Sequence, residues 1–196
     1  MSYWVGRIIL GTVGWKAVGE LPDDCPRAVF IAAPHTSNWD LVLMLACAFV
    51  LGVPLSWVGK HSMFEVPLLG RFLLALRGVP VIRHKGLNQV DQMSAAITGS
   101  ERMYLALAPS GTRGKKDHWK SGFYHVAIAA NVPIICGHLD YKTKSGGIGP
   151  IIAPSGDIKA DMEKFRAFYG PLEGKKNENK TDIRLRDEVP EATKPA

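Results

Sequence analysis

His35 and Asp40 are the two side chains in this sequence whose types and spacing are best suited to chemistry. They are separated by four residues and lie in a polar stretch, 34–40, between two apolar runs. An aspartate that accepts a hydrogen bond from one imidazole nitrogen fixes the tautomer and leaves the other nitrogen free to take a proton. The pair is therefore a candidate general base that would act on a hydroxyl group.

The segments on either side indicate how this pair is positioned. Residues 29–33 are apolar and follow Pro26, which predicts a buried strand. Ser37 and Asp40 match a capping box, with Ser37 as the N-cap and Asp40 at N3 of a helix that runs to about Leu51. A strand-to-helix junction is where α/β enzymes tend to place functional residues. The same spacing also occurs in ordinary helix caps, so a purely structural role stays open for the pair on its own.

Short apolar runs alternate with helical patterns along the rest of the chain. The pattern predicts strands at 55–58, 79–82, 103–108 and 132–137, and a hairpin within 141–153. It predicts helices at 67–76, 88–99, 121–131 and 157–169. This alternation indicates a single α/β domain with a mostly parallel central sheet and helices on both faces.

Cationic side chains follow several of the predicted strands. Lys60, Arg83 and Arg113 each come shortly after a strand, as His35 does. The carboxyl ends of parallel strands share one edge of the sheet, where ligands bind. One general base and several cations at one edge suit an anionic substrate that carries a hydroxyl group.

The charge distribution supports an anionic partner. The chain has 196 residues and a net charge of +6, and residues 60–120 carry ten Lys or Arg against four Asp or Glu. Such a field favours phosphate, an anionic membrane, an acidic protein or nucleic acid, although a solvated basic face is the alternative. The aromatic residues are not interleaved with the cations as in nucleic-acid-binding motifs, which argues against nucleic acid.

The two ends of the chain differ from its middle. Residues 1–19 are apolar and aromatic but interrupted by Arg7 and Lys16, which predicts an amphipathic helix, either at a membrane interface or packed on the domain. Residues 171–196 are polar without periodicity, which predicts a flexible tail and leaves 20–170 as the domain. The cysteines show no paired or metal-type spacing, which favours a reducing, cytoplasmic compartment.

Taken in order, these blocks resemble the glycerolipid acyltransferases typified by 1-acylglycerol-3-phosphate acyltransferase. The resemblance runs from about Val29 to Asp140, and His35 and Asp40 match the first block of that family. The further matches, in chain order, are Lys60, Pro67 and Gly70; Gly78 to Arg83; Pro109 with Gly111, Thr112 and Arg113; and Val132-Pro133-Ile134.

The resemblance implies a glycerol-3-phosphate acyltransferase-like fold and a role for each matched block. His35 would deprotonate an acceptor hydroxyl and Asp40 would orient its ring. The residues implied to hold the anionic acceptor are Lys60, Arg83, Gly111, Thr112 and Arg113, and those implied on the acyl side are Val132 and Pro133. No metal or other cofactor is implied, and acyl-CoA or acyl-carrier protein would be the co-substrate.

The implied reaction moves a fatty acyl group from a thioester to a lipid hydroxyl, with lysophosphatidate as the acceptor in phospholipid biosynthesis. Three positions depart from the family pattern: Pro34 replaces asparagine, Ser110 replaces glutamate and Cys136 replaces proline. Ser110 leaves open a non-phosphate acceptor such as an acyl-amino-acid (ornithine-type) lipid. A catalytically silent lipid-binding module is the remaining alternative, against which the intact His/Asp pair argues. The expected partners are the acyl donor, the lipid acceptor and an anionic membrane surface, to which the protein would attach peripherally.

Overall fold

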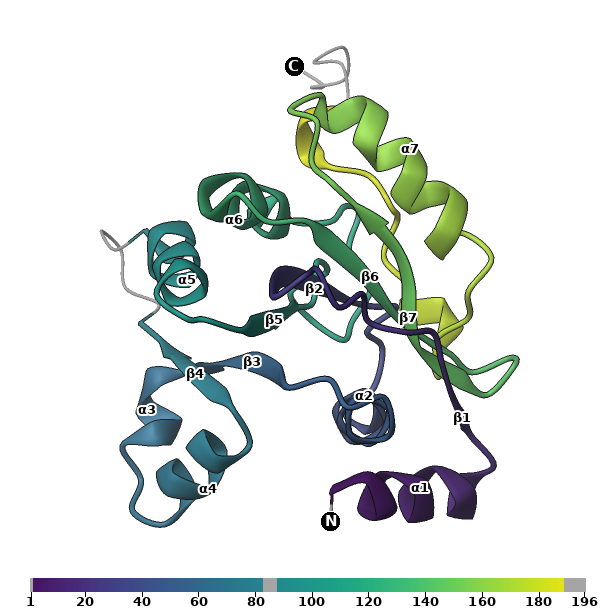
Figure 1. The fold of residues 1–196 in the computed structure, drawn as a ribbon. Helices are drawn as coiled ribbons and strands as arrows, with labels where there is room; N and C mark the ends of the chain where they lie inside the picture. Colours follow the sequence, from purple (N-terminus) through teal and green to yellow (C-terminus); the bar gives the residue numbers. More distant parts are fainter. Residues whose placement is uncertain (1, 83–87, 189–196) are drawn as a thin grey trace.

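The computed structural model describes residues 2–82 and 88–188, and over these residues the chain forms one seven-stranded sheet between two layers of helices (Figure 1). The strand order is β1-β7-β6-β2-β5-β3-β4, and every neighbouring pair is parallel except β6 and β7. The strands are β1 (Lys16–Val18), β2 (Arg27–Ala33), β3 (Leu55–Lys60), β4 (Gly78–Val81), β5 (Met103–Leu107), β6 (Ile134–Asp140) and β7 (Ser145–Ile152). The predicted α/β architecture with a mostly parallel sheet is therefore confirmed.

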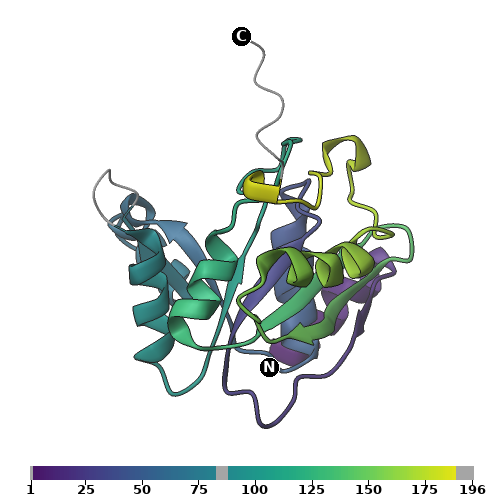
Figure 2. The same ribbon diagram turned by 90° about the horizontal axis from the view of Figure 1, so that it is seen from above.

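The helices cover both faces of this sheet. One face carries α5 (Gln89–Thr98), α6 (Gly122–Ala130) and α7 (Ile158–Tyr169), and Figure 2 looks onto this side. The other face carries α1 (Ser2–Val13), α2 (Trp39–Val50), α3 (His61–Phe64) and α4 (Leu69–Ala75). Two short 3-10 helices, η1 (Asn177–Asn179) and η2 (Arg186–Glu188), follow α7.

The strand β2 shows why both faces must be covered. Val29 and Ile31 are fully buried in the core beneath α5, α6 and α7, whereas Ala28 and Phe30 face the core beneath α2. Since side chains alternate between the faces of a strand, a strand that is apolar at every position is buried on both sides. The uninterrupted apolar run 28–33 therefore specifies a central strand.

The N-terminal segment differs from the predicted helix over residues 1–19. The helix α1 ends at Val13, and Lys16–Val18 forms the edge strand β1, which pairs parallel with β7. Gly14 has a positive φ of 70°, a conformation that interrupts a helix. The helix buries Gly6 and Leu10 while Trp4 and Ile8 are 66% and 65% exposed, so it is packed on the domain and still presents apolar side chains to solvent.

The prediction of a loose tail from residue 171 is wrong for residues 171–188. Leu185 is buried in the main core and forms an isolated bridge with Trp119. The Lys180 ammonium donates to the carbonyls of Tyr169, Gly170 and Leu172 at the end of α7. A few long-range contacts of this kind leave no periodic pattern in the sequence, which is why the segment looks unstructured from its composition.

Candidate active site

The carboxyl ends of β2, β5 and β3 lie at one edge of the sheet, as predicted. In the register of the parallel strands, Ile31 pairs with Leu107 and Trp57 pairs with Ala106. His35 follows β2, the loop 109–113 follows β5 and Lys60 ends β3, so all three blocks emerge at this edge. Arg83 lies outside the described residues.

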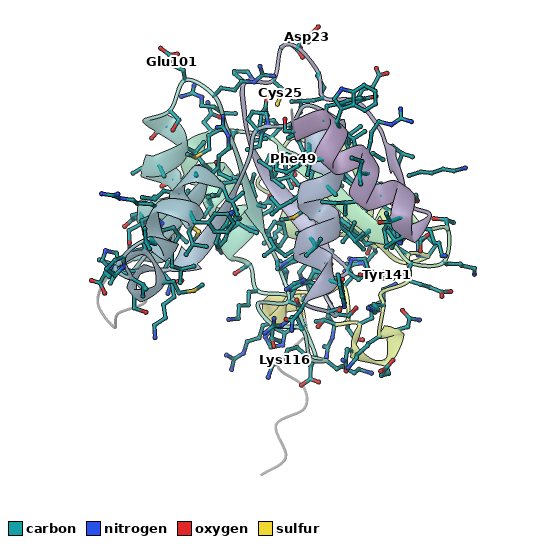
Figure 3. All side chains as sticks on the ribbon, turned by 90° about the horizontal axis from the view of Figure 1, so that it is seen from below. Asp23, Cys25, Phe49, Glu101, Lys116 and Tyr141 are labelled. Atoms are coloured by element: carbon teal, nitrogen blue, oxygen red, sulfur yellow. The ribbon has the colours of Figure 1, made fainter. Side chains whose placement is uncertain are left out.

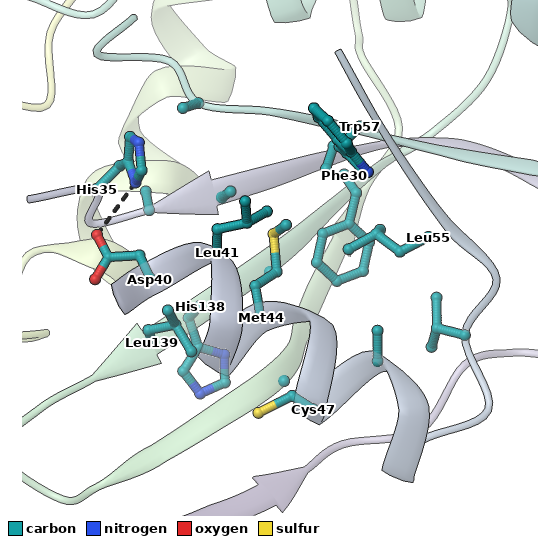
Figure 4. Close-up of a pocket in the computed structure, with 18 of the residues that line it drawn as sticks. Phe30, His35, Asp40, Leu41, Met44, Cys47, Leu55, Trp57, His138 and Leu139 are labelled. Carbon is teal, nitrogen blue, oxygen red and sulfur yellow. Dashed lines mark hydrogen bonds and ion pairs between the residues drawn. The ribbon is translucent and has the colours of Figure 1, made fainter. Parts of the chain in front are cut away.

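His35 and Asp40 contact each other directly at this edge (Figure 4). The ring Nδ1 atom of His35 lies 3.1 Å from Oδ2 of Asp40. The His35 side chain is 26% exposed, whereas Asp40 is only 3% exposed. The aspartate is thus enclosed by protein, while part of the imidazole is open to solvent.

The Asp40 carboxylate accepts hydrogen bonds from several donors. Its Oδ2 atom receives the backbone N–H groups of Thr36 and Ser37 at 2.8 and 2.9 Å, and its Oδ1 atom receives the Tyr141 hydroxyl at 2.7 Å. Burial raises the pKa of Asp40, but the bonds from His35, Tyr141, Ser37 and Thr36 outweigh it and lower that pKa below its usual range. Because an ionised carboxylate only accepts, the Nδ1 atom of His35 must carry the proton.

The predicted capping box forms only in part, because the N–H of Asp40 bonds to the Ser37 carbonyl and not to its hydroxyl. Ser37 Oγ accepts the N–H of Trp39 at 3.2 Å while Asp40 accepts the N–H of Ser37, although α2 begins at Trp39 and Asn38 occupies the N-cap position. Helix starts commonly differ by one residue between criteria. The structural and the chemical interpretations of the pair are therefore compatible, since the contact at the helix start also fixes the carboxylate beside His35.

A cavity of about 400 Å³ opens beside the pair. His35, Asp40 and Arg113 all line it, and it extends between the sheet and α2 past Met44 to Leu51 and Val53. Its far part is lined almost entirely by apolar side chains: Phe30, Leu41, Met44, Ala48, Leu51, Val53, Leu55, Trp57 and Ile148. Such a cavity suits an aliphatic chain whose polar end lies at His35.

The loop after β5 brings Arg113 to the mouth of this cavity. Gly111 has a positive φ of 64°, and the buried Ser110 hydroxyl donates to the carbonyl of Thr112 at 2.7 Å. Ser110 therefore folds its hydroxyl onto its own loop. Within the part of the chain that the structure describes, Arg113 forms no ion pair with Asp117.

The structure does not bring every predicted site residue to the cavity. Lys60, Gly111 and Thr112 lie at the same edge but do not line it. Val132 and Pro133 precede β6, at the opposite end of that strand, where the Pro133 carbonyl accepts the N–H of Val29. This placement separates them from the cavity, which Gly137, His138 and Leu139 at the other end of β6 line instead. Among the described residues, no cluster of three His, Cys, Asp or Glu side chains forms a metal site.

Sequence reasoning missed Tyr141 and the C-terminal segment near the site. Tyr141 reaches Asp40 across 101 positions of sequence, and the backbone N–H of Lys176 donates to Thr36 Oγ1 across 140 positions. Neither contact leaves a local pattern. The one sequence signal near Tyr141 is its position directly after the apolar run 134–140. This run forms a strand parallel to β2, and residues that follow the carboxyl ends of parallel strands lie at the edge where ligands bind.

The fold and the site together define a class of protein. The sequence profile of the family described as Acyltransferase matches residues 20–137, and the chain belongs to this family. The match includes His35, Asp40 and the loop that carries Arg113, whereas Tyr141 and the segment 171–188 lie beyond it.

Particular relatives carry more specific names. The chain is 28% identical over 144 residues to a 1-acyl-sn-glycerol-3-phosphate acyltransferase of Haemophilus influenzae, covering 69% of this chain and 58% of the relative. It is 32% identical over 131 residues to the protein of that name from Salmonella typhimurium, covering 62% and 51%. The chain thus spans little more than half the length of these relatives. The crystal structure of PlsC, the 1-acyl-sn-glycerophosphate acyltransferase of Thermotoga maritima, shares the fold, with a TM-score of 0.57, 14% identity and coverage of 84% of this chain and 73% of that one.

Proposed function

We propose that this protein transfers a fatty acyl group from an acyl thioester to the hydroxyl of a lysophospholipid, with lysophosphatidate as the acceptor. One observation carries the proposal. A histidine held by a buried carboxylate stands at the mouth of an apolar cavity that an arginine also lines. This combination supplies a base for a hydroxyl, space for an acyl chain and a cation for an anionic head group.

The geometry supports a direct transfer in two stages. His35 Nε2 takes the proton of the acceptor hydroxyl while the hydroxyl oxygen attacks the carbonyl carbon of the thioester. The carbonyl oxygen then becomes an oxyanion. The C–S bond then breaks, the carbonyl re-forms, and the imidazolium returns its proton to the departing thiolate. Asp40 stabilises the imidazolium that exists between these stages. The amides of Thr36 and Ser37 bond to Asp40, so they serve the base rather than the oxyanion.

Arg113 is the residue proposed to select the acceptor. A guanidinium donates two parallel hydrogen bonds to a phosphate, and this arginine lines the cavity that His35 also lines. The other residues proposed to bind the acceptor are Lys60, Arg83, Gly111 and Thr112. The buried Ser110, where the family pattern has glutamate, supports the second candidate acceptor, a non-phosphate acyl-amino-acid lipid.

Attachment to an anionic membrane surface is part of the same proposal, on the cytoplasmic side. In the described part of the chain, no helix has the length and apolar character needed to cross a bilayer. The two helices α1 and α4 lie on the side of the sheet that carries α2, and both expose apolar side chains. Leu68, which directly precedes α4, and Phe72 within it are 78% and 60% exposed, in addition to Trp4 and Ile8 of α1. Exposed apolar residues on one side of a basic protein are suited to an interfacial membrane contact.

The test is thiol release measured with matched donors and acceptors. Acyl-CoA and acyl-carrier protein would each be offered with lysophosphatidate, lysophosphatidylcholine, an acyl-ornithine lipid or no acceptor, on anionic vesicles. We expect release that depends on lysophosphatidate and yields one ester per thiol. Faster turnover of the ornithine lipid would replace the first acceptor by the second. Release that is independent of any acceptor, or none with either donor, would reject acyl transfer to a lipid.

A further inference from the structure

Tyr141 holds the oxygen of Asp40 that His35 does not contact. Its hydroxyl donates to Asp40 Oδ1 at 2.7 Å, whereas the His35 ring and two backbone amides share Oδ2. Tyr141 follows β6 and reaches the first turn of α2, and Figure 3 shows it at the opposite end of that helix from Phe49. The two oxygens of the buried carboxylate are thus divided between the loop that carries His35 and a remote part of the chain.

The tyrosine is itself fixed by both ends of the protein. Its ring meets the buried Trp15 edge to face, with centroids 4.8 Å apart and planes at 80°. Its backbone N–H donates to the carbonyl of Glu173 at 2.9 Å. An aromatic ring held in this way loses little further freedom when its hydroxyl bonds to Asp40. The position of the carboxylate is therefore set by packing that involves β1, β6 and the C-terminal segment.

The protonation state of the tyrosine suits a permanent donor. Burial, followed by the hydrogen bond and the negative charge of Asp40, raises the pKa of Tyr141 far above its ordinary value. The hydroxyl is therefore a proton donor to Asp40 around neutral pH. Its bond to Oδ1 leaves Oδ2 for Nδ1 of His35, so in this arrangement Nε2 is the ring nitrogen without a partner on Asp40.

We propose that Tyr141 is a positioning residue for the His35–Asp40 pair, acting through Asp40 and not touching the substrates. The inference rests on the proposed acyl transfer for its kinetic consequence, while its structural consequence, the tautomer of His35, can be measured without turnover. Without the hydroxyl, Oδ1 of a buried carboxylate loses its donor, and only the contacts of Oδ2 with His35, Thr36 and Ser37 still hold the carboxylate, so it is oriented less firmly against the imidazole. The ring then samples the tautomer with the proton on Nε2, which cannot act as a base.

The test compares Tyr141→Phe with a matched control, Tyr124→Phe. Tyr124 also donates its hydroxyl to a buried aspartate, Asp161, at 2.9 Å, but on the face covered by α6 and α7. Each variant thus removes one tyrosine–aspartate hydrogen bond and keeps the ring. Steady-state kinetics, thermal melting and long-range ¹H–¹⁵N correlation of the His35 ring would be recorded for both proteins and for the wild type.

We expect Tyr141→Phe to lower kcat about tenfold with little change in either KM, as the loss of one hydrogen bond to a charged group implies. Its His35 ring should show a mixture of tautomers where the wild type shows the Nδ1–H form. Tyr124→Phe should lower the melting temperature and leave kcat and the tautomer unchanged. Wild-type kcat in Tyr141→Phe, or an equal fall in both variants, would overturn the inference. If the wild-type protein releases no thiol, the proposed function fails, and an unchanged tautomer in Tyr141→Phe would separately overturn the role of Tyr141.

Discussion

Gly174 lies directly against Thr36, the residue that follows His35. A Cβ atom built on Gly174 would come within 2.7 Å of Thr36 Oγ1. Two residues further along the chain, the backbone N–H of Lys176 donates to the same oxygen at 3.3 Å. Thr36 is 3% exposed because the segment 173–176 covers it. Residues from beyond the match to the family profile thus support the loop that binds Asp40.

Gly174→Ala should therefore lower both stability and turnover. The new methyl group must displace either the covering segment or Thr36, and overpacking of this kind costs about 1–3 kcal/mol. Gly122→Ala is the matched control, because a Cβ atom there meets no heavy atom within 4 Å. Chemical denaturation and thiol release would be measured on both. Equal behaviour of the two variants would show that the segment does not constrain the loop.

His35→Ala should abolish most of the acyl transfer while leaving the fold intact. Loss of a general base slows a reaction by about 10² to 10⁴. The control is His125→Ala, which removes an exposed histidine on α6. Thiol release would be measured alongside melting. A folded His35→Ala protein with nearly wild-type release would refute the assignment of the base.

Arg113→Lys should raise the KM for the acceptor strongly and leave the KM for the donor nearly unchanged. Lysine keeps the charge but cannot reproduce the paired bonds of a guanidinium to phosphate. Arg166→Lys provides the comparison, because that arginine bonds to Glu163 and Glu188 far from the cavity and should affect melting only. If Arg113→Lys raised both KM values alike and lowered the melting temperature, Arg113 would be a structural residue of its loop.

Membrane contact should depend on both α1 and α4. The double variants Trp4→Ser/Ile8→Ser and Leu68→Ser/Phe72→Ser should each weaken binding to anionic vesicles about tenfold or more, since each lost side chain would otherwise be removed from water. Ile128→Ser is the control, because Ile128 is 46% exposed on α6, on the opposite face of the sheet. Vesicle sedimentation would measure the bound fraction of the wild type, the two double variants and Ile128→Ser. Binding that is unchanged in the α4 variant would restrict the contact to α1.

Stability should fall in acid partly because of Asp161. Burial raises the pKa of this carboxyl, but bonds from Lys164, Ser155 and Tyr124 outweigh it and hold the pKa below its ordinary value of 3.8. Between the lowered pKa of folded Asp161 and the ordinary pKa of the unfolded chain, the unfolded state therefore binds more protons. The contribution of the Asp161 carboxylate to the free energy of unfolding is complete above about pH 5 and is lost as the pH falls through the lowered pKa. Denaturation of wild type and Asp161→Asn between about pH 2 and pH 7 would test this. The difference in unfolding free energy between the two proteins should shrink at low pH, and a constant difference would contradict it.

The sequence predicts the part of the site that is local or repeated along the chain. The alternation of apolar runs places His35 and Arg113 at one edge of a parallel sheet, and the structure has both lining one cavity. The three-residue strand β1 is too short to show any periodicity, so the sequence pattern does not separate it from the helix before it. Tyr141 could not be found because a single phenol that reaches Asp40 over a long separation has no local pattern. The proposed acyl-side role of Val132 and Pro133 came from resemblance alone, and strand register places these two residues at the far end of β6.

The pairing of β2 with β5 has a consequence for the choice of acceptor. His35 and Arg113 emerge from neighbouring strands whose alignment, Ile31 opposite Leu107, is fixed by backbone hydrogen bonds. The register therefore fixes where the two loops leave the sheet, and the loop 109–112 together with the Arg113 side chain sets the remaining separation between the base and the guanidinium. Under the proposed function, an acceptor would be selected by the separation between its hydroxyl and its anionic group, and lengthening the loop 109–112 by one residue would change the matching separation in the protein without altering any contacting side chain.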